Sequence, residues 1–118
     1  MGVLEEIAAA VRNVTERSGG SVVGIGDRFG LGSGVVVAEG RVVTNAHNVR
    51  SEEVSVTFST GRKTTGRVAG LDQEGDLAVV AVDTADAAPL AFAEPTSLSV
   101  GLPVFGASNP GGRGLRVT

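Results

Sequence analysis

The sequence predicts an all-β protein, namely a small antiparallel barrel of six strands with a short N-terminal helix. Hydrophobic residues make up 42% of the chain, most of them valine and alanine, and 18 of the 118 residues are glycine. Valine is enriched in strands and glycine in the tight turns between them. Short apolar runs also recur with turn residues between them, which is typical of strands that are joined by hairpins and close into a barrel.

Residues 3–17 have the spacing of a helix. Four apolar residues recur at intervals of three and four: Leu4, Ile7, Val11 and Val14. Acidic residues near the start and Arg17 near the end suit the helix dipole, and the glycines that follow Ser18 should end the helix. We predict a short amphipathic helix that packs on the barrel, with contact to a sister subunit as the alternative.

From Ser21 onward the pattern is that of strands. The expected strands are residues 21–25, 35–38, 41–44, 54–58, 62–69, 77–82 and 103–107. These seven segments are roughly as many as the six strands of a small barrel. We expect the run at 35–38 to be apolar on both faces, strand 62–69 to be polar and exposed, and strand 77–82 to be a fully apolar core strand.

The connections follow from turn residues. Glu39-Gly40 and Thr60-Gly61 predict tight hairpin turns, because glycine readily adopts positive φ. Residues 45–50 are too few for a regular helix and fit a single turn. We expect a loop at 26–30, an irregular stretch at 85–95 and a flexible loop at 109–114.

The composition excludes several classes of function. The net charge is −3, with acidic and basic residues interspersed, so no basic stripe suits a nucleic acid. Aromatic residues make up only 3% of the chain, which leaves few platforms for base stacking. The absence of cysteine excludes disulfides, thiolate chemistry and cysteine-based zinc sites.

The sequence has no evident targeting segment. No apolar run approaches the roughly 20 residues that span a bilayer, and residues 1–17 lack the cationic start and apolar stretch of a signal peptide. We expect either a cytoplasmic protein or a targeting segment outside the 118 residues. Residues 116–118 have the pattern of a strand without a closing turn, so we expect a piece of a longer protein.

His47 is the only histidine and follows the predicted strand 41–44. Histidine is the most frequent general base near neutral pH, because its side chain titrates there. A single histidine in a chain of this length is usually incidental to function. Here, however, the small Ala46 leaves room for a neighbouring chain or a substrate, and the turn that follows would fix the direction of the ring. His47 is therefore a candidate general base.

Asp76 directly precedes the apolar strand 77–82. A carboxylate at the edge of a core is costly to bury without a partner. An imidazole N–H is a suitable partner, whose tautomer the carboxylate would fix. The alternative is that Asp76 caps a turn with Gly75. Asp72 and Glu74 do not directly precede the strand, and we expect them to be solvated. His47 and Asp76 together predict two members of a Ser-His-Asp triad.

Three segments, in this order, resemble the trypsin-like serine endopeptidases and most closely their HtrA (Deg) family: Gly32-Ser33-Gly34-Val35-Val36-Val37, Val42-Val43-Thr44-Asn45-Ala46-His47 and Asp76-Leu77-Ala78-Val79. The likeness extends from about Ser21 to Thr118. It implies that His47 is the general base and that Asp76 orients it. Residues 104–112 are similar to the family's G-N-P-x-G segment, which closes the first barrel and leads to the second.

The chain departs from the family's pattern in two respects. Asn48 stands where an apolar residue usually follows the histidine, which should alter the local turn without removing the base. The family's nucleophile motif, a serine in a G-N-S-G-G loop, does not occur in the 118 residues. Ser108 matches the interdomain segment, and Ser33 matches a strand entry where glycines permit a bend. Neither serine is the expected nucleophile.

The resemblance implies that the oxyanion hole and most of the specificity pocket would lie beside that serine. Without these groups nearly all the rate enhancement is lost, so we expect the 118-residue chain not to hydrolyse peptides by itself. The expected function is that of the N-terminal half of a serine endopeptidase. This half supplies histidine and aspartate, needs no metal or cofactor, and belongs to an enzyme that acts on unfolded or misfolded polypeptides.

Two other functions stay open. A non-enzymatic relative of the proteases could bind peptides or partner proteins through an exposed strand edge. Against this hypothesis, a binding module needs neither His47 nor Asp76. A first barrel that exists alone would expose the apolar face that normally meets the second barrel, and it should then dimerise or exchange strands.

The expected organisation has three parts: residues 1–20 as the N-terminal helix and linker, 21–108 as the first protease barrel, and 109–118 as the interdomain segment that leads to a second barrel. The expected partners are a polypeptide substrate and that second barrel, without nucleic acid. A homo-oligomer or a domain-swapped dimer stays open. The resemblance suggests an extracytoplasmic or membrane-anchored parent protein.

Overall fold

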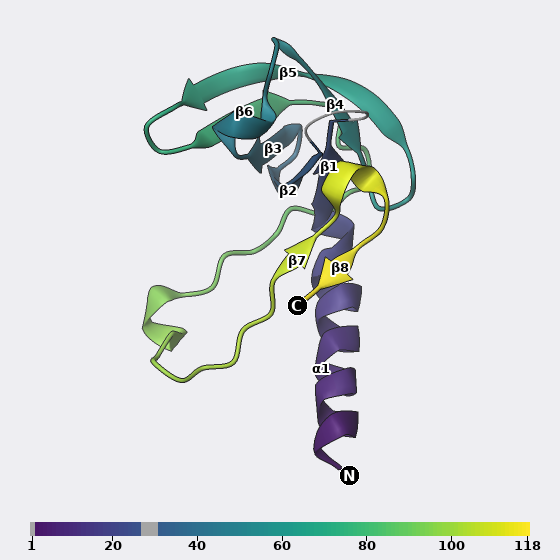
Figure 1. Ribbon diagram of the computed structural model, residues 1–118, viewed down its shortest axis with the longest axis vertical. Coiled ribbons are helices and arrows are strands. Elements are labelled where there is room, and N and C mark those ends of the chain that lie inside the picture. Colours follow the sequence, from purple (N-terminus) through teal and green to yellow (C-terminus); the bar gives the residue numbers. More distant parts are fainter. Residues whose placement is uncertain (1, 27–30) are drawn as a thin grey trace.

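The six-stranded barrel predicted from the sequence is confirmed. The computed structural model, which describes residues 2–26 and 31–118, has a closed antiparallel barrel with the strand order β1-β2-β3-β6-β5-β4 (Figure 1). Its strands are β1 (Val22–Ile25), β2 (Gly32–Ala38), β3 (Arg41–Thr44), β4 (Glu53–Thr57), β5 (Lys63–Asp72) and β6 (Leu77–Ala81). Most of the loop expected at 26–30 lies outside the described residues.

The core of the barrel consists almost entirely of valine side chains. Strands of a barrel direct alternate residues inward, and these residues form one buried cluster. Its members are Val23, Ile25, Val36, Val42, Val54, Val56, Phe58, Val80 and Val82. Full burial of a side chain of this size contributes about 1.5–3 kcal/mol, so this cluster is the main source of stability in the fold.

Strand β6 contributes to the core, as expected of strand 77–82, through one of its two faces. Ala78 and Val80 are buried, but Leu77 is 49% exposed and Val79 is only half-buried. A strand of a closed barrel has only one face toward the interior, even when every one of its side chains is apolar. The expected strand at 62–69 extends further, as β5, to Asp72.

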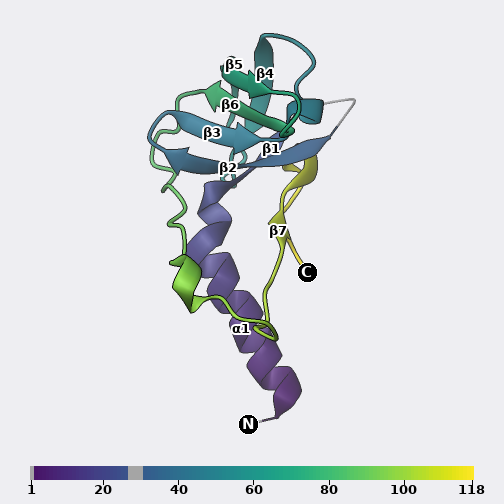
Figure 2. The same ribbon diagram turned by 90° about the vertical axis from the view of Figure 1, so that its left-hand side faces the viewer.

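The N-terminal helix forms as predicted, as α1 (Val3–Ser18), but it does not pack on the barrel as expected. No residue of α1 is buried. In Figures 1 and 2 the helix stands out from one end of the barrel, with the N-terminus at its far end. In the part of the chain that the structure describes, no helix combines the length and the apolar character needed to cross a membrane.

The strand expected at 103–107 is almost absent. The structure has only a two-residue strand, β7 (Ala107–Ser108), which pairs with β8 (Arg116–Val117). This pairing continues through two hydrogen bonds between Gly106 and Thr118 and no further. Residues 98–105 carry apolar side chains but have no partner strand among the described residues, and Val104 is 76% exposed.

The loop expected to be flexible at 109–114 is instead packed on the barrel. It forms the short 3₁₀ turn η4 (Pro110–Gly112), and Asn109 is only 3% exposed. The Asn109 N–H donates a hydrogen bond to Ser33 Oγ (2.8 Å), and the Gly114 N–H donates one to Asn109 Oδ1 (2.9 Å). The glycines of η4 lie so close to Gly24 of β1 that a Cβ at Gly24 would overlap the Gly112 backbone.

Candidate active site

The barrel brings the two candidate residues together at one end. Strands β3 and β6 are antiparallel neighbours, and their register pairs Thr44, the last residue of β3, with Ala78 near the start of β6. The 3₁₀ turn η2 (Ala46–Asn48) follows β3, and Asp76 directly precedes β6. Because the end of one strand lies beside the start of the other, His47 and Asp76 become neighbours although 29 residues separate them.

Two hydrogen bonds join His47 and Asp76. The ring atom Nδ1 of His47 lies 2.7 Å from Oδ2 of Asp76. The backbone N–H of His47 donates a second hydrogen bond, of 3.0 Å, to Oδ1 of the same carboxylate. Both carboxylate oxygens are therefore engaged by one residue, which fixes the orientation of the ring relative to the barrel.

These contacts favour the ionised carboxylate. The hydrogen bond from the His47 backbone N–H is the largest cause that lowers the pKa of Asp76 below its ordinary value of 3.8, and the bond from the His47 side chain is the next. An ionised carboxylate only accepts hydrogen bonds, so the neutral ring carries its proton on Nδ1. The lone pair of Nε2 is then directed away from Asp76, and Nε2 is the atom that can accept a proton from another group.

Asn45 is a member of this site that was not predicted from the sequence. Its side-chain amide donates a hydrogen bond to the backbone carbonyl of Asp76 (3.1 Å). Asp76 has a φ of 54°, in the left-handed region that few residues other than glycine adopt. The sequence does show an amide side chain directly after strand 41–44 and two residues before His47. This spacing alone did not indicate that the amide bonds to Asp76.

Asn48 is accommodated beside the site. Its side-chain amide donates a hydrogen bond to Oγ1 of the buried Thr44 (3.1 Å), and that hydroxyl donates one to the Ser33 carbonyl (2.7 Å). A Cβ at Gly32 would overlap the Asn48 amide, so the glycine leaves room for the amide in this position. The turn η2 therefore forms with Asn48 in place.

The other candidates have structural roles. Ser33 Oγ accepts the hydrogen bond from Asn109, and Ser108 pairs with Arg116 in the β7–β8 sheet. Asp72 accepts a hydrogen bond from the Gly75 N–H (3.0 Å) in an exposed turn, which agrees with the expectation of a solvated residue. Across residues 2–26 and 31–118, no three histidine, aspartate or glutamate side chains are grouped as metal ligands would be.

Apolar surface adjoins the His47–Asp76 pair. A groove of about 440 Å³ begins at the residues next to the pair, Asn45 and Leu77. It continues over the outward-facing Val35 and Val43 to Phe105. A site with exposed apolar walls can bind another polypeptide segment by burying those walls.

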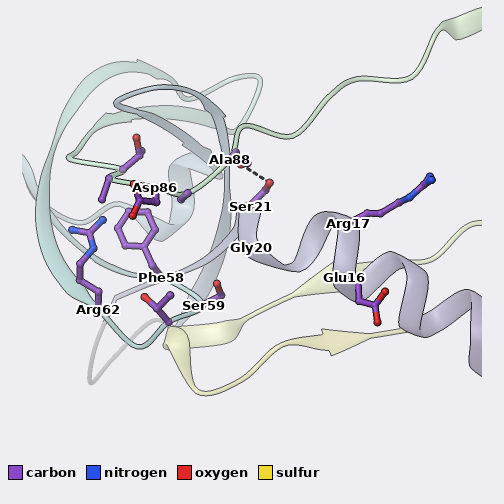
Figure 3. Close-up of a pocket in the computed structure, with 13 residues that line it drawn as sticks. Glu16, Arg17, Gly20, Ser21, Phe58, Ser59, Arg62, Asp86 and Ala88 are labelled. Carbon is purple, nitrogen blue, oxygen red and sulfur yellow. Dashed lines mark hydrogen bonds between the residues drawn. The ribbon is translucent and has the colours of Figure 1, made fainter.

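Figure 3 shows the residues that line a second pocket, of about 470 Å³. Its lining includes Asp86 and Ala88, which follow β6 in sequence, whereas Asp76 directly precedes that strand. Arg62 lies over the Phe58 ring at 4.2 Å and donates a hydrogen bond to the Asp83 carbonyl (2.8 Å). Ser21 Oγ donates one to the Ala88 carbonyl, drawn as a dashed line in Figure 3. These contacts join the walls of the pocket to one another, so we assign them to the fold.

The comparisons with known proteins agree with one another. Residues 32–118 match the family model of the trypsin-like peptidase domain. The chain is 34% identical over 94 residues to a probable periplasmic serine endoprotease, DegP-like, of Halomonas elongata; the match covers 78% of this chain and 20% of the relative. It is 36% identical over 87 residues to a serine protease, HtrA-like, of Staphylococcus aureus, covering 68% and 11%.

The fold gives the same result. The crystal structure of the serine endoprotease from Yersinia pestis superposes with a TM-score of 0.80 at 27% identity, covering 91% of this chain and 42% of that one. The chain therefore spans about a fifth or less of the length of these two curated relatives and less than half of this structural neighbour.

Proposed function

Because the chain belongs to the trypsin-like peptidase family and to its HtrA-like branch, we propose that it is the first barrel of a serine endopeptidase, with His47 as the general base and Asp76 as the residue that orients it. The observation that carries this proposal is the His47–Asp76 geometry, with Nδ1 2.7 Å from Oδ2 and the His47 N–H 3.0 Å from Oδ1. A carboxylate held in this way stabilises the imidazolium that forms during proton transfer.

In the proposed reaction, a serine from outside the 118 residues is the nucleophile. Its hydroxyl proton passes to Nε2 of His47 while its oxygen attacks the peptide carbonyl. The other ring proton stays on Nδ1, hydrogen-bonded to Asp76, whose carboxylate balances the new charge. His47 then gives the proton from Nε2 to the leaving amine, and water repeats the sequence to release the acyl group.

The proposal includes a second barrel as partner, and the isolated chain is then inactive. Three observations support this. The His47 side chain is 68% exposed, that of Asp76 is 43% exposed, and the apolar groove beside them is open. A partner covering this end would exclude water and strengthen the electrostatic contacts of the pair. The exposed apolar side chains of 98–105 offer more surface for the same partner.

The proposed organisation follows the expectation from the sequence. Residues 21–108 are the first barrel, since all six barrel strands lie within that range, and 109–118 lead to the second barrel. The substrate is an unfolded or misfolded polypeptide. The Halomonas relative is named as periplasmic, which supports an extracytoplasmic or membrane-anchored setting for the longer protein.

The test begins with the native gene beyond codon 118. We expect a downstream segment with a serine in a glycine-rich loop, and we expect the product to cleave casein. His47→Ala and Asp76→Asn should each lower kcat/KM by about 10⁴-fold, whereas Asp72→Asn, an exposed carboxylate on the neighbouring turn, should leave it unchanged. The 118-residue chain should neither cleave casein nor react with a fluorophosphonate. Full activity of the His47→Ala enzyme would overturn the proposal.

One alternative is a barrel that binds peptides without cleaving them, for which the open apolar groove beside the pair provides a surface. Each of the six barrel strands is paired on both sides, so a peptide would have to use the β7–β8 sheet or the groove rather than a free barrel edge. In this alternative a native stop codon follows Thr118, and His47→Ala leaves peptide affinity unchanged in a calorimetric titration.

A further inference from the structure

Strands β3 and β6 separate just before the His47–Asp76 pair. Their last backbone pairing is Thr44 with Ala78. One step further, Asn45 would face Leu77, and two steps further Ala46 would face Asp76. The backbone does not continue in this way, because residues 46–48 turn into η2 and Asp76 adopts a φ of 54°. The link between the two segments therefore depends on side chains.

The Asn45 side chain provides one such link. The Asn45 backbone is still extended, with φ −81° and ψ 143°, as in the strand before it. From this position its amide donates a 3.1 Å hydrogen bond to the Asp76 carbonyl. A carboxamide N–H is chemically close to a peptide N–H, so Asn45 extends the sheet's hydrogen bonding beyond the point where the strands part.

Three donors from two nearby residues, Asn45 and His47, thus converge on Asp76. The Asn45 amide holds its backbone carbonyl, and the N–H and Nδ1 of His47 hold its two carboxylate oxygens. A residue other than glycine in the left-handed region persists only where its surroundings fix it. The two His47 donors fix the carboxylate. The Asn45 amide fixes the carbonyl side of the Asp76 backbone, while the Asp76 N–H donates a hydrogen bond to the Gln73 carbonyl (3.3 Å).

We propose that Asn45 is a positioning residue of the proposed active site, which holds the Asp76 backbone in the left-handed conformation that aims its carboxylate at His47. Asn45 acts through Asp76 and contacts no reacting group. The inference rests on the proposed function for its catalytic meaning, but its geometric content can be tested in the 118-residue chain without measuring activity.

The test uses the ¹⁵N-labelled 118-residue chain and the substitution Asn45→Leu, which keeps the shape of the side chain and removes the donor. Asn13→Leu, the same change on the exposed face of α1, is the matched control. NMR of the His47 ring reports the tautomer and the exchange of the Nδ1 proton with water. We expect Asn45→Leu to accelerate this exchange about tenfold, the effect of losing one hydrogen bond, and to shift the tautomer toward Nε2–H. Asn13→Leu should leave both unchanged.

Two measurements separate positioning from a general structural role. Asn45→Gln keeps an amide donor on an exposed side chain, and it should restore most of the protection of the Nδ1 proton. Thermal unfolding of Asn45→Leu should stay close to that of Asn13→Leu. A wild-type tautomer and exchange rate in Asn45→Leu would overturn the proposal, as would a lower melting temperature without a change at His47. If Asn45→Leu does not fold, Asn45→Ala is measured against the same expectations.

The proposed function and this inference can fail separately. Loss of protection of the Nδ1 proton in Asn45→Leu, together with full protease activity of a His47→Ala enzyme, would support the positioning role and refute the catalytic role of the pair. Unchanged His47 spectra in Asn45→Leu, together with loss of activity in His47→Ala, would refute the positioning role alone.

Discussion

The barrel and helix α1 carry similar apolar side chains in opposite environments. Ile25 of β1 is fully buried, whereas Ile7 of α1 is 49% exposed. The apolar pattern of α1 suffices for a helix to be predicted, but it does not ensure that the helix face is covered. The comparison teaches that periodicity specifies the local element, whereas burial depends on the segments that surround it. The barrel strands bury their own apolar side chains, whereas the apolar face of α1 stays exposed.

The largest difference in stability should come from replacing one isoleucine by alanine in each region separately. Ile25→Ala leaves a cavity in the core and should lower the free energy of unfolding by about 2–5 kcal/mol. Ile7→Ala removes the same atoms from a half-exposed site and should change it by less than about 0.5 kcal/mol. Urea unfolding followed by circular dichroism measures both. Equal losses would show that the face of α1 is covered in solution, for example by a second copy of the chain.

Two glycines test how closely residues 110–112 pack on β1. A Cβ at Gly24 of β1 would overlap the backbone of Gly112, whereas a Cβ at Gly20, next to the helix, would meet nothing within 4 Å. Gly24→Ala should therefore lower the free energy of unfolding by about 1–3 kcal/mol, because a backbone has to shift. Gly20→Ala should be close to neutral. A neutral Gly24→Ala would contradict the packing of residues 110–112 on β1.

Two threonines of the barrel differ in the hydrogen bonding of their side chains. Both are buried, but Thr44 Oγ1 has two hydrogen-bond partners, whereas Thr57 Oγ1 has none within the described ranges 2–26 and 31–118. Thr44→Val should cost about 1–2 kcal/mol, since it leaves the Ser33 carbonyl without its donor. Thr57→Val should be neutral or slightly stabilising. Denaturant midpoints of the two variants provide the measurement, and a similar loss in both would indicate a partner for Thr57.

The smallest effect concerns acid stability. Because the His47 N–H and side chain lower the pKa of Asp76 below 3.8, folding favours its ionised form. The resulting stability is fully present above about pH 3.8 and is lost as the pH falls through the lower pKa of the folded state. The difference in unfolding free energy between the wild type and Asp76→Asn should therefore shrink on acidification from about pH 5 to pH 2. A difference that stays constant over this range would contradict the shift.

Much of the fold was predictable because local patterns determine it. The intervals between Leu4, Ile7, Val11 and Val14 indicated the helix, and the turn at Glu39-Gly40 fixed the β2–β3 hairpin, with Gly40 at φ 75°. His47 and Asp76 were chosen because each adjoins an apolar strand. Strand order then brought them together, which a sequence shows only through resemblance to a known family.

The errors lie where contacts distant in sequence decide the outcome. Residues 103–107 have strand-like composition, but a strand also needs a partner, and only the last two of these residues and Ser108 have one. Asn109 was assigned to a flexible loop because of the glycines that follow it, yet its partner is Ser33, 76 residues away. Asn45 was overlooked for the same reason, because its partner follows it by 31 residues.

The contact between η4 and β1 also affects the order in which the chain acquires its structure during synthesis. All hydrogen bonds of α1 are local, so the helix can form soon after it leaves the ribosome. Strand β1 emerges next, but it receives its outer cover only after residue 112 has followed. Contacts that close such long loops are made slowly. The nascent barrel therefore passes through an interval in which β1 has been translated but lacks its outer cover.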